Sequence, residues 1–73
     1  MNAIMSERAV YPIRSHPHLR ELRLKNKMSQ DELAFRSGVT QPRLSRAERG
    51  YLWLATDERE RVANVLKVTH DAL

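Results

Sequence analysis

Residues 29–50, SQDELAFRSGVTQPRLSRAERG, constrain the fold of this chain more than any other stretch. Ser29 can accept a hydrogen bond from the unpaired amides of a first helical turn, and Glu32 completes a capping-box pattern. Gly38 ends this helix where a residue with positive φ is needed, and Val39 supplies the hydrophobic contact that accompanies such an end. We therefore expect a short helix followed by a tight turn.

A second short helix is expected directly after this turn. Thr40 is its N-cap, and Pro42 falls in its first turn, where no amide proton is needed. Gly50 supplies its stop. The inward side of this helix holds Leu44, Ala47 and Glu48, and its outward side holds Gln41, Pro42, Arg43, Ser45, Arg46 and Arg49.

The outward face of this second helix carries three arginines, one glutamine and no acidic residue. A charged face by itself is more often the solvated surface of a helical bundle. Here it follows a capped helix and a glycine turn, and an α-helix is about as wide as the major groove of DNA admits. The combination favours a helix that reads duplex DNA over a merely solvated face.

The other helices are expected from caps and apolar spacing. The full expected set covers residues 17–26, 30–37, 41–49 and 57–66, with a short helix over 69–73. Ser15 or His16 is the expected N-cap of the first helix, with Pro17 at its first position. Thr56 is the expected N-cap of the fourth, and Phe35 is expected to be half covered. The expected core contacts of these two helices are Leu19, Leu22, Leu24 and Met28, and Val62, Ala63, Val65 and Leu66.

Composition places the chain among small all-α domains. Its 73 residues make one domain at most, with a net stability of about 3–5 kcal/mol. Two glycines and many strong helix formers argue against a sheet. The chain has no cysteine, which excludes disulfides, a thiolate nucleophile and a Cys-based zinc site, and no apolar run is long enough for a signal peptide or a membrane span.

Positive charge concentrates in the part of the chain that carries the motif. The formal net charge is +4, with ten Lys/Arg against five Asp/Glu in residues 1–50 and three against four in residues 51–73. Residues 1–14 lack helical periodicity and are expected to form a flexible N-terminal arm ahead of a domain at 15–73. Arg8 and Arg14 on this arm could reach phosphates or a minor groove, although a flexible terminus with scattered charge is more often merely disordered.

An apolar segment, Tyr51-Leu52-Trp53-Leu54, follows the second helix of the motif and holds the one tryptophan. One interpretation is that Trp53 and Leu54 cover the core between the third and fourth helices. The alternative is a surface for a second copy or another protein, with Tyr51, Leu52 and Trp53 as its contact residues. The sequence leaves both open.

An enzyme is not supported by the residues present. His16, His18 and His70 are conceivable metal ligands, but their positions do not match a known ligand spacing. The chain has no Gly-rich phosphate loop and no recognisable set of Ser, His and acidic residues. We therefore expect no catalytic residue, metal or cofactor.

Residues 18–68, about two thirds of the chain, resemble the lambda-repressor-like domain of Xre-type helix-turn-helix proteins. The matching residues in register are Leu22-Arg23, Ser29-Gln30-x-Glu32-Leu33-Ala34, Gly38-Val39-Thr40, Leu44-Ser45 and Glu48-x-Gly50. The resemblance implies a compact all-α fold of four to five helices. It also implies that the third helix lies in the major groove, with the second above it.

The resemblance further implies which residues contact DNA. Gln41, Pro42, Arg43 and Arg46 match positions that face base edges, and Ser29, Gln30 and Thr40 match positions that contact phosphates; Ser45 and Arg49 on the same face are expected to contact phosphates too. Glutamine suits the adenine edge and arginine the guanine edge. Pro42 departs from the polar residue often found at its position and can make only an apolar contact, for instance with a thymine methyl group.

An ion pair is also implied by the resemblance. Members of the family commonly pair an arginine of the first helix with a glutamate at the end of the third, and Arg23 and Glu48 stand at these positions. We expect this pair to be structural and partly buried.

The expected function is a sequence-specific, double-stranded DNA-binding transcriptional regulator that acts as a repressor in the cytoplasm, on the nucleoid. One domain offers one helix to one groove, so a homodimer that reads a near-palindromic site is expected. The resemblance implies a bacterial or phage origin. The alternative is a protein-interaction module of the same fold, an antitoxin or adaptor, that binds its partner through residues 51–54.

Overall fold

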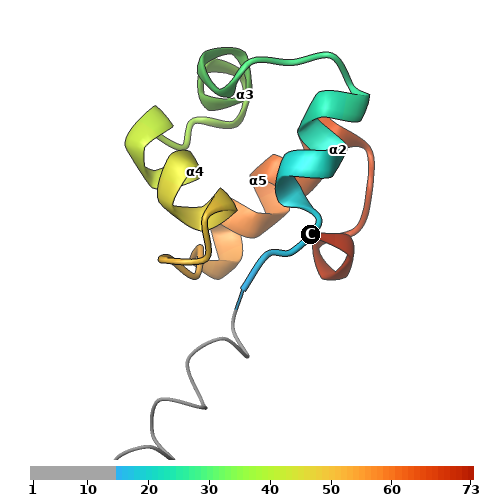
Figure 1. The fold of residues 1–73 in the computed structure, drawn as a ribbon. Helices are drawn as coiled ribbons and strands as arrows, with labels where there is room; N and C mark the ends of the chain where they lie inside the picture. The colour runs from blue at the N-terminus through green and yellow to red at the C-terminus, as the bar shows by residue number, and fades with distance from the viewer. Residues whose placement is uncertain (1–14) are drawn as a thin grey trace, which may run out of the picture.

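The computed structural model describes residues 15–73, so the expected arm over residues 1–14 lies outside the described part. Its elements are α2 (Leu19–Lys25), α3 (Gln30–Ser37), α4 (Gln41–Glu48), α5 (Thr56–Leu66) and a closing 3-10 turn, η2 (His70–Ala72). Within residues 15–73 there is no strand, and the predicted all-α fold is confirmed. Helix α3 packs on both α4 and α5, α2 packs on α4, and η2 packs on α5 (Figure 1).

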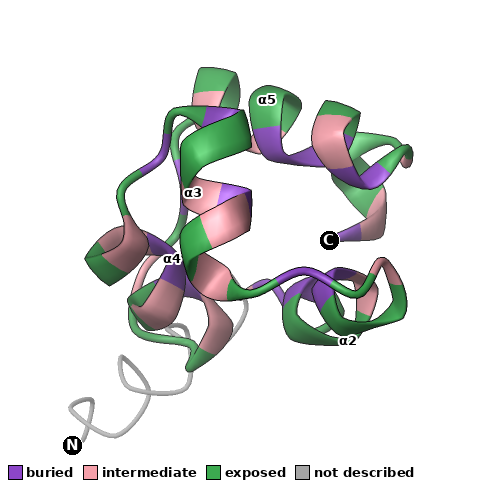
Figure 2. Cartoon of the chain, turned by 90° about the horizontal axis from the view of Figure 1, so that it is seen from above, coloured by how far each residue is buried: buried purple, intermediate pink, exposed green. Residues whose placement is uncertain are grey.

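The core lies in the space that the four helices enclose, and Figure 2 shows buried segments on their inner sides. Leu33, Leu44 and Leu54 are completely buried there. The whole core cluster consists of Leu19, Met28, Leu33, Val39, Leu44, Ala47, Leu54, Val62, Ala63, Leu66 and Leu73. Because Leu33 and Leu44 are both inside this cluster, the faces that α3 and α4 turn to solvent are set by the core.

The helix caps of the motif follow the sequence closely. The Ser29 hydroxyl accepts a hydrogen bond from the Glu32 amide at 3.0 Å. The Glu32 carboxylate does not complete the expected capping box in this arrangement, since it pairs with Arg36 at 2.9 Å. Gly38 ends α3 at φ 76°, and Val39 after it is 2% exposed.

Helix α2 begins later than expected because its start is held by the end of the chain. The predicted first position, Pro17, lies in a turn, and His18 is the N-cap of a helix that runs over Leu19–Lys25. The His18 amide donates to the Leu73 carbonyl at 2.7 Å, a contact between residues far apart in sequence. Tertiary contact therefore decides this boundary.

Three further expectations about burial and capping were wrong. Ala55, rather than Thr56, is the N-cap of α5, and its amide donates to the Glu58 carboxylate at 2.9 Å. Phe35, expected to be half covered, is 89% exposed, and Leu24, expected in the core, is 53% exposed. Both side chains lie on the outer faces of their helices, since the inner faces are already occupied by Leu33 and Leu19.

None of the helices within residues 15–73 reaches the length and mean hydropathy that a membrane span requires.

Candidate nucleic-acid interface

The outer face of α4 is the candidate recognition surface. Leu44 and Ala47 are completely buried, so the opposite side of the helix points away from the core. Pro42, Arg46 and Arg49 are exposed there, and Gln41, Arg43 and Ser45 are half-buried. The first turn of α4 contains no acidic residue. The surface therefore presents an amide and three guanidinium groups, which are the donors that DNA bases and phosphates accept.

A chain of side-chain hydrogen bonds aligns α4 with α3. The Gln41 Nε2 donates to Gln30 Oε1 at 2.6 Å, and the Gln30 Nε2 donates to Glu48 Oε1 at 3.0 Å. Gln30 thus uses both ends of its amide inside the protein. Gln41 keeps its carbonyl oxygen and its second amide proton for another partner.

The structure brings Arg23 and Glu48 together at the inner end of this chain of bonds. Arg23 Nε donates to Glu48 Oε2 at 2.6 Å, and Arg23 Nη2 donates to Glu48 Oε1 at 3.0 Å. The third nitrogen, Nη1, donates to the Met28 carbonyl at 2.8 Å. The two side chains are only 9% and 3% exposed. Every nitrogen of this guanidinium therefore has an acceptor, as a buried charge requires.

The pair also sets the ionisation of Glu48. Burial raises the pKa of the Glu48 carboxyl, but the hydrogen bonds from Arg23 and Gln30 and the charge of Arg23 outweigh it, so the pKa lies below 4.5. The hydrogen bond that Arg23 donates to Glu48 raises the pKa of Arg23. Both groups are charged at neutral pH, and the pair connects α2 to the end of α4.

Arg43 has a partner that was not expected from the sequence. Its Nε donates to Glu58 Oε2 at 2.8 Å and its Nη2 donates to Glu58 Oε1 at 2.7 Å. Hydrogen bonding to Arg43 lowers the pKa of Glu58 and raises that of Arg43. The sequence indicated Glu58 as an acidic residue at the start of a helix, but nothing in it indicated which cation the carboxylate would meet.

The remaining candidate DNA contacts border the same face. Ser29 and Thr40 are exposed N-caps of α3 and α4, and the Ser29 hydroxyl is used by its own helix. The Thr40 hydroxyl makes no capping hydrogen bond within the described chain. The Arg49 guanidinium lies 5.5 Å from the ring centroid of Tyr51. The hydrogen bond between Gln41 and Gln30 joins the first turns of α3 and α4, so the two N-caps lie near the start of the outer face of α4.

The apolar segment 51–54 divides between core and surface. Leu54 is completely buried and Leu52 packs against the core, as the covering interpretation requires. Tyr51 is 76% exposed and Trp53 is 37% exposed. The Trp53 ring stacks on His16, with centroids 4.5 Å apart, and the Arg59 guanidinium lies 4.6 Å from its centroid. Among the three candidate interface residues, Tyr51 presents the most surface.

His16 was missed as a core residue. It is 3% exposed, and its Nε2 accepts a hydrogen bond from the Leu54 amide at 3.1 Å. Burial first, and then the charge of Arg59, lowers the pKa of His16 below 6.5. The ring is therefore neutral at neutral pH, with its proton on Nδ1. No sequence signal links His16 to a segment 38 positions away.

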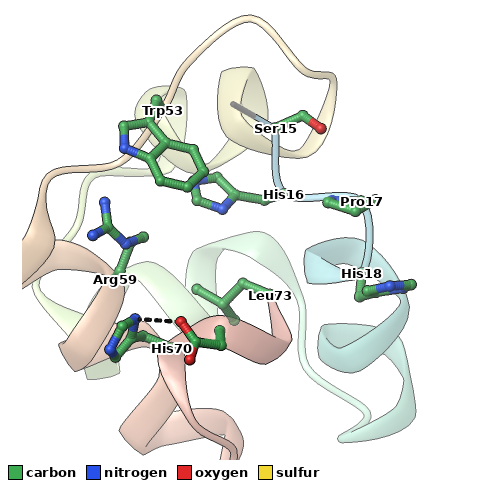
Figure 3. A pocket seen from close by; sticks show the side chains of 9 residues that line it. Ser15, His16, Pro17, His18, Trp53, Arg59, His70 and Leu73 are labelled. Carbon is green, nitrogen blue, oxygen red and sulfur yellow. Dashed lines mark ion pairs between the residues drawn. The ribbon is translucent and has the colours of Figure 1, made fainter. Parts of the chain in front are cut away.

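A cleft of mixed polar and apolar lining opens beside the His16 ring (Figure 3). It has a volume of about 320 Å³, and its lining residues are Ser15, His16, Pro17, His18, Trp53, Arg59, His70, Asp71 and Leu73. Two of the histidines considered as metal ligands, His18 and His70, pair instead with Glu21 and Asp71, at 3.6 and 3.3 Å. Within residues 15–73 no three His, Asp or Glu side chains are grouped closely enough to hold a metal ion.

Protein stability is expected to decrease as the pH falls below 6.5, because of His16. Its pKa in the folded state is below this ordinary value, so in that range the unfolded chain takes up a proton that the folded chain does not. Thermal melts at about pH 7.5 and about pH 5.5 should give a lower Tm at the acidic value, and His16→Asn should remove most of the difference. The control is His18→Asn, at an exposed histidine, which should keep the wild-type difference. An undiminished difference in His16→Asn would contradict this assignment.

Comparison with known proteins gives one family. The family model described as helix-turn-helix matches residues 19–73, which is α2 through the end of the chain. Neither the curated proteins nor the solved structures yielded a match. The matched region contains α3, its glycine turn and α4, together with all the hydrogen bonds that connect Gln41 to Arg23.

Proposed function

Because the chain belongs to the helix-turn-helix family of the Xre, lambda-repressor-like type, we propose that it is a sequence-specific regulator of transcription that reads the major groove with α4. The family's domain is a DNA-binding, non-enzymatic type. The observation that carries the specific proposal is the outer face of α4, where Gln41, Arg43 and Arg46 project from a helix whose inner side is completely buried.

Base reading is assigned to Gln41, Arg43 and Arg46, with Pro42 in apolar contact. Gln41 is oriented by Gln30, so its remaining donor and acceptor can address an adenine edge. The arginines suit guanine O6 and N7. Phosphate contacts are assigned to Ser29, Thr40, Ser45 and Arg49, and to Gln30 through its backbone amide, because its side chain is already engaged.

The regulator is proposed to act as a homodimer on an inverted repeat. A single α4 contacts only a few base pairs, which is too little for selective binding to a genome. Two copies related by a two-fold axis would place their recognition helices about 34 Å apart, in successive major grooves. Repression is the expected mode, because occupying a promoter needs no activating contact. The proposed site of action is the cytoplasm, on the nucleoid.

A second candidate function is a protein-interaction module, an antitoxin or adaptor. The observation in its favour is Tyr51, which is 76% exposed beside the half-exposed Trp53 and the packed Leu52. Under this proposal the arginines of α4 are dispensable and the surface at residues 51–53 carries binding. The experiment that follows separates the two functions.

The test is selection of bound duplexes from a randomised pool, followed by fluorescence anisotropy with the selected site. Wild type should enrich an inverted repeat, and affinity should fall by about a thousandfold as salt rises from about 50 to about 200 mM, if some six phosphates are neutralised. The variant Arg43→Ala/Arg46→Ala should lose about tenfold or more of the preference over random DNA for each lost base contact.

A matched control removes the same charge elsewhere. Arg20→Ala/Lys25→Ala takes two positive charges from exposed positions of α2 and should keep the wild-type sequence preference. Absence of binding at low salt, or equal preference in the α4 double variant and wild type, would reject DNA reading by α4. The function would then move to the surface at residues 51–53 and a protein partner.

A further inference from the structure

We propose that Glu58 is a positioning residue that holds Arg43 in the orientation in which it reads a guanine. The proposal rests on the DNA-reading function proposed above and adds a specificity determinant on α5, outside the helix-turn-helix itself. It starts from the way in which the two side chains meet: Arg43 uses Nε and Nη2, at 2.8 and 2.7 Å, for one carboxylate.

The edge of the Arg43 guanidinium that Glu58 occupies determines which N–H donors remain for a base. Nε and Nη2 form the side edge of the planar group, and a carboxylate that accepts from both takes one proton from each. Both protons of Nη1 and the second proton of Nη2 are not used by Glu58. One proton of Nη1 and the second proton of Nη2 form the end edge of the group, a fork of parallel donors that fits guanine O6 and N7. The ion pair and a guanine can therefore be held by one arginine at the same time.

The protein already contains one arginine that works in this way. Arg23 gives its side edge to Glu48 at 2.6 and 3.0 Å and uses Nη1 for the Met28 carbonyl at 2.8 Å. There the third nitrogen finds its acceptor inside the protein. The Arg43 side chain, on the outer face of α4, is 39% exposed, so its Nη1 belongs to a guanidinium group that solvent can reach.

Glu58 is fixed by more than its arginine. Its side chain is only 14% exposed, and Oε1 accepts from the Ala55 amide at 2.9 Å as well as from Arg43. The carboxylate thus closes the first turn of α5, where the helix dipole favours a negative charge. An arginine bound to this anchor loses less rotamer freedom when it meets a base than one that moves freely in solvent.

The same ion pair also allows the opposite interpretation, in which Glu58 keeps Arg43 away from DNA. The two readings predict opposite effects of removing the charge of Glu58. If it positions Arg43, removal lowers discrimination at one base pair. If it withholds Arg43, removal raises affinity for the selected site and keeps or increases that discrimination.

The experiment uses the full chain and the duplex selected by wild type. Each G·C pair of the half-site is replaced by A·T in turn, and the affinity ratio is measured for wild type, Arg43→Ala and Glu58→Gln. Arg43→Ala should lose discrimination at one pair, which identifies the guanine. Glu58→Gln should lose about three- to tenfold at that same pair and nothing at the others. The glutamine retains an oxygen for the Ala55 amide, and a loss of folding would lower binding to all duplexes without changing a ratio.

Glu60→Gln is the charge-matched control, an exposed glutamate on the same helix. It changes net charge by the same amount and should leave every ratio at the wild-type value. A second readout needs no DNA: hydrogen exchange at Arg43 Nε, followed by NMR, should be slow in wild type and Glu60→Gln and faster in Glu58→Gln. Equal exchange in all three would overturn the proposal, because the ion pair would not exist in solution.

Two binding outcomes separate the positioning role of Glu58 from the DNA-reading function on which it rests. In the first, Arg43→Ala loses discrimination at a guanine, but Glu58→Gln keeps it or binds the selected site more tightly with full discrimination. The positioning role of Glu58 is then overturned, while base reading by Arg43 stands. If wild type prefers no sequence, or Arg43→Ala changes no ratio, base reading by Arg43 fails and the role of Glu58 falls with it.

Discussion

Glu48→Ala is expected to lower the free energy of unfolding by about 3 kcal/mol, a large share of the total for a domain of this size. The alanine leaves the guanidinium of Arg23 without its carboxylate in a site where that side chain is only 9% exposed. It also removes the acceptor of the Gln30 amide, so that α3, α4 and α2 lose a shared contact. Thermal melts should show a Tm lower by about 12–24 °C.

The control for this prediction removes the whole pair. In Arg23→Met/Glu48→Leu no charge is left buried, and the stability should recover much of the loss, since hydrophobic replacements of a buried ion pair are often neutral. A Glu48→Ala melt that coincides with wild type would show that the pair contributes nothing to stability.

The pH dependence of the pair follows from the direction of the Glu48 pKa. This pKa is lower in the folded chain than its ordinary value of 4.5, so the contribution of Glu48 is complete above 4.5 and is lost as the pH falls below it. It therefore acts in a more acidic range than His16, whose contribution is lost below 6.5.

Leu54→Ala is expected to destabilise the domain by about 2–5 kcal/mol, enough to unfold much of the population. Leu54 is completely buried in the core cluster, and the smaller side chain leaves a cavity there. Its backbone also bonds to two side chains: the amide donates to His16, 38 positions away, and the carbonyl accepts from Arg59 at 2.7 Å. These bonds keep the segment in place, so the cavity cannot simply collapse.

Tyr51→Ala is the control within the same apolar segment. Tyr51 is 76% exposed, and its loss should change the free energy of unfolding by less than about 1 kcal/mol. Chemical denaturation of both variants checks the contrast. If the two variants were equally destabilised, the division of the segment into a buried and an exposed part would be wrong.

Sequence reasoning worked best where the deciding interactions are local. Ser29 caps α3 through a hydroxyl three residues from the amide that it binds, and Gly38 ends α3 in the left-handed conformation at φ 76°. These contacts depend on a few consecutive residues, and the predicted range 30–37 agrees with α3, Gln30–Ser37. The family resemblance added one long-range contact, the pair of Arg23 and Glu48, from positions known to meet.

Sequence reasoning was less accurate where helix boundaries and the buried width of a helix face depend on packing. The expected start of α2 was wrong because the carbonyl of Leu73, far away in sequence, accepts from the His18 amide. The N-cap of α5 was misassigned at a local contact, since the Glu58 carboxylate accepts from the Ala55 amide. Phe35 was expected to be half covered, but its helix already buries Leu33 and Ser37 on the inner side. Periodicity tells which residues share a face, but not how wide a stripe the neighbouring helices cover.

The sequence by itself determined that this chain forms short capped helices, that residues 30–48 make two of them around a glycine turn, and that the second carries a basic outer face. Only the tertiary structure decided that His16 is a neutral core residue and that Arg43 is held by Glu58. Caps and turns arise from contacts within about four residues, which the order of the chain dictates. Partners of buried rings and of guanidinium groups are chosen from whatever the packed helices bring together, and no local pattern encodes that choice.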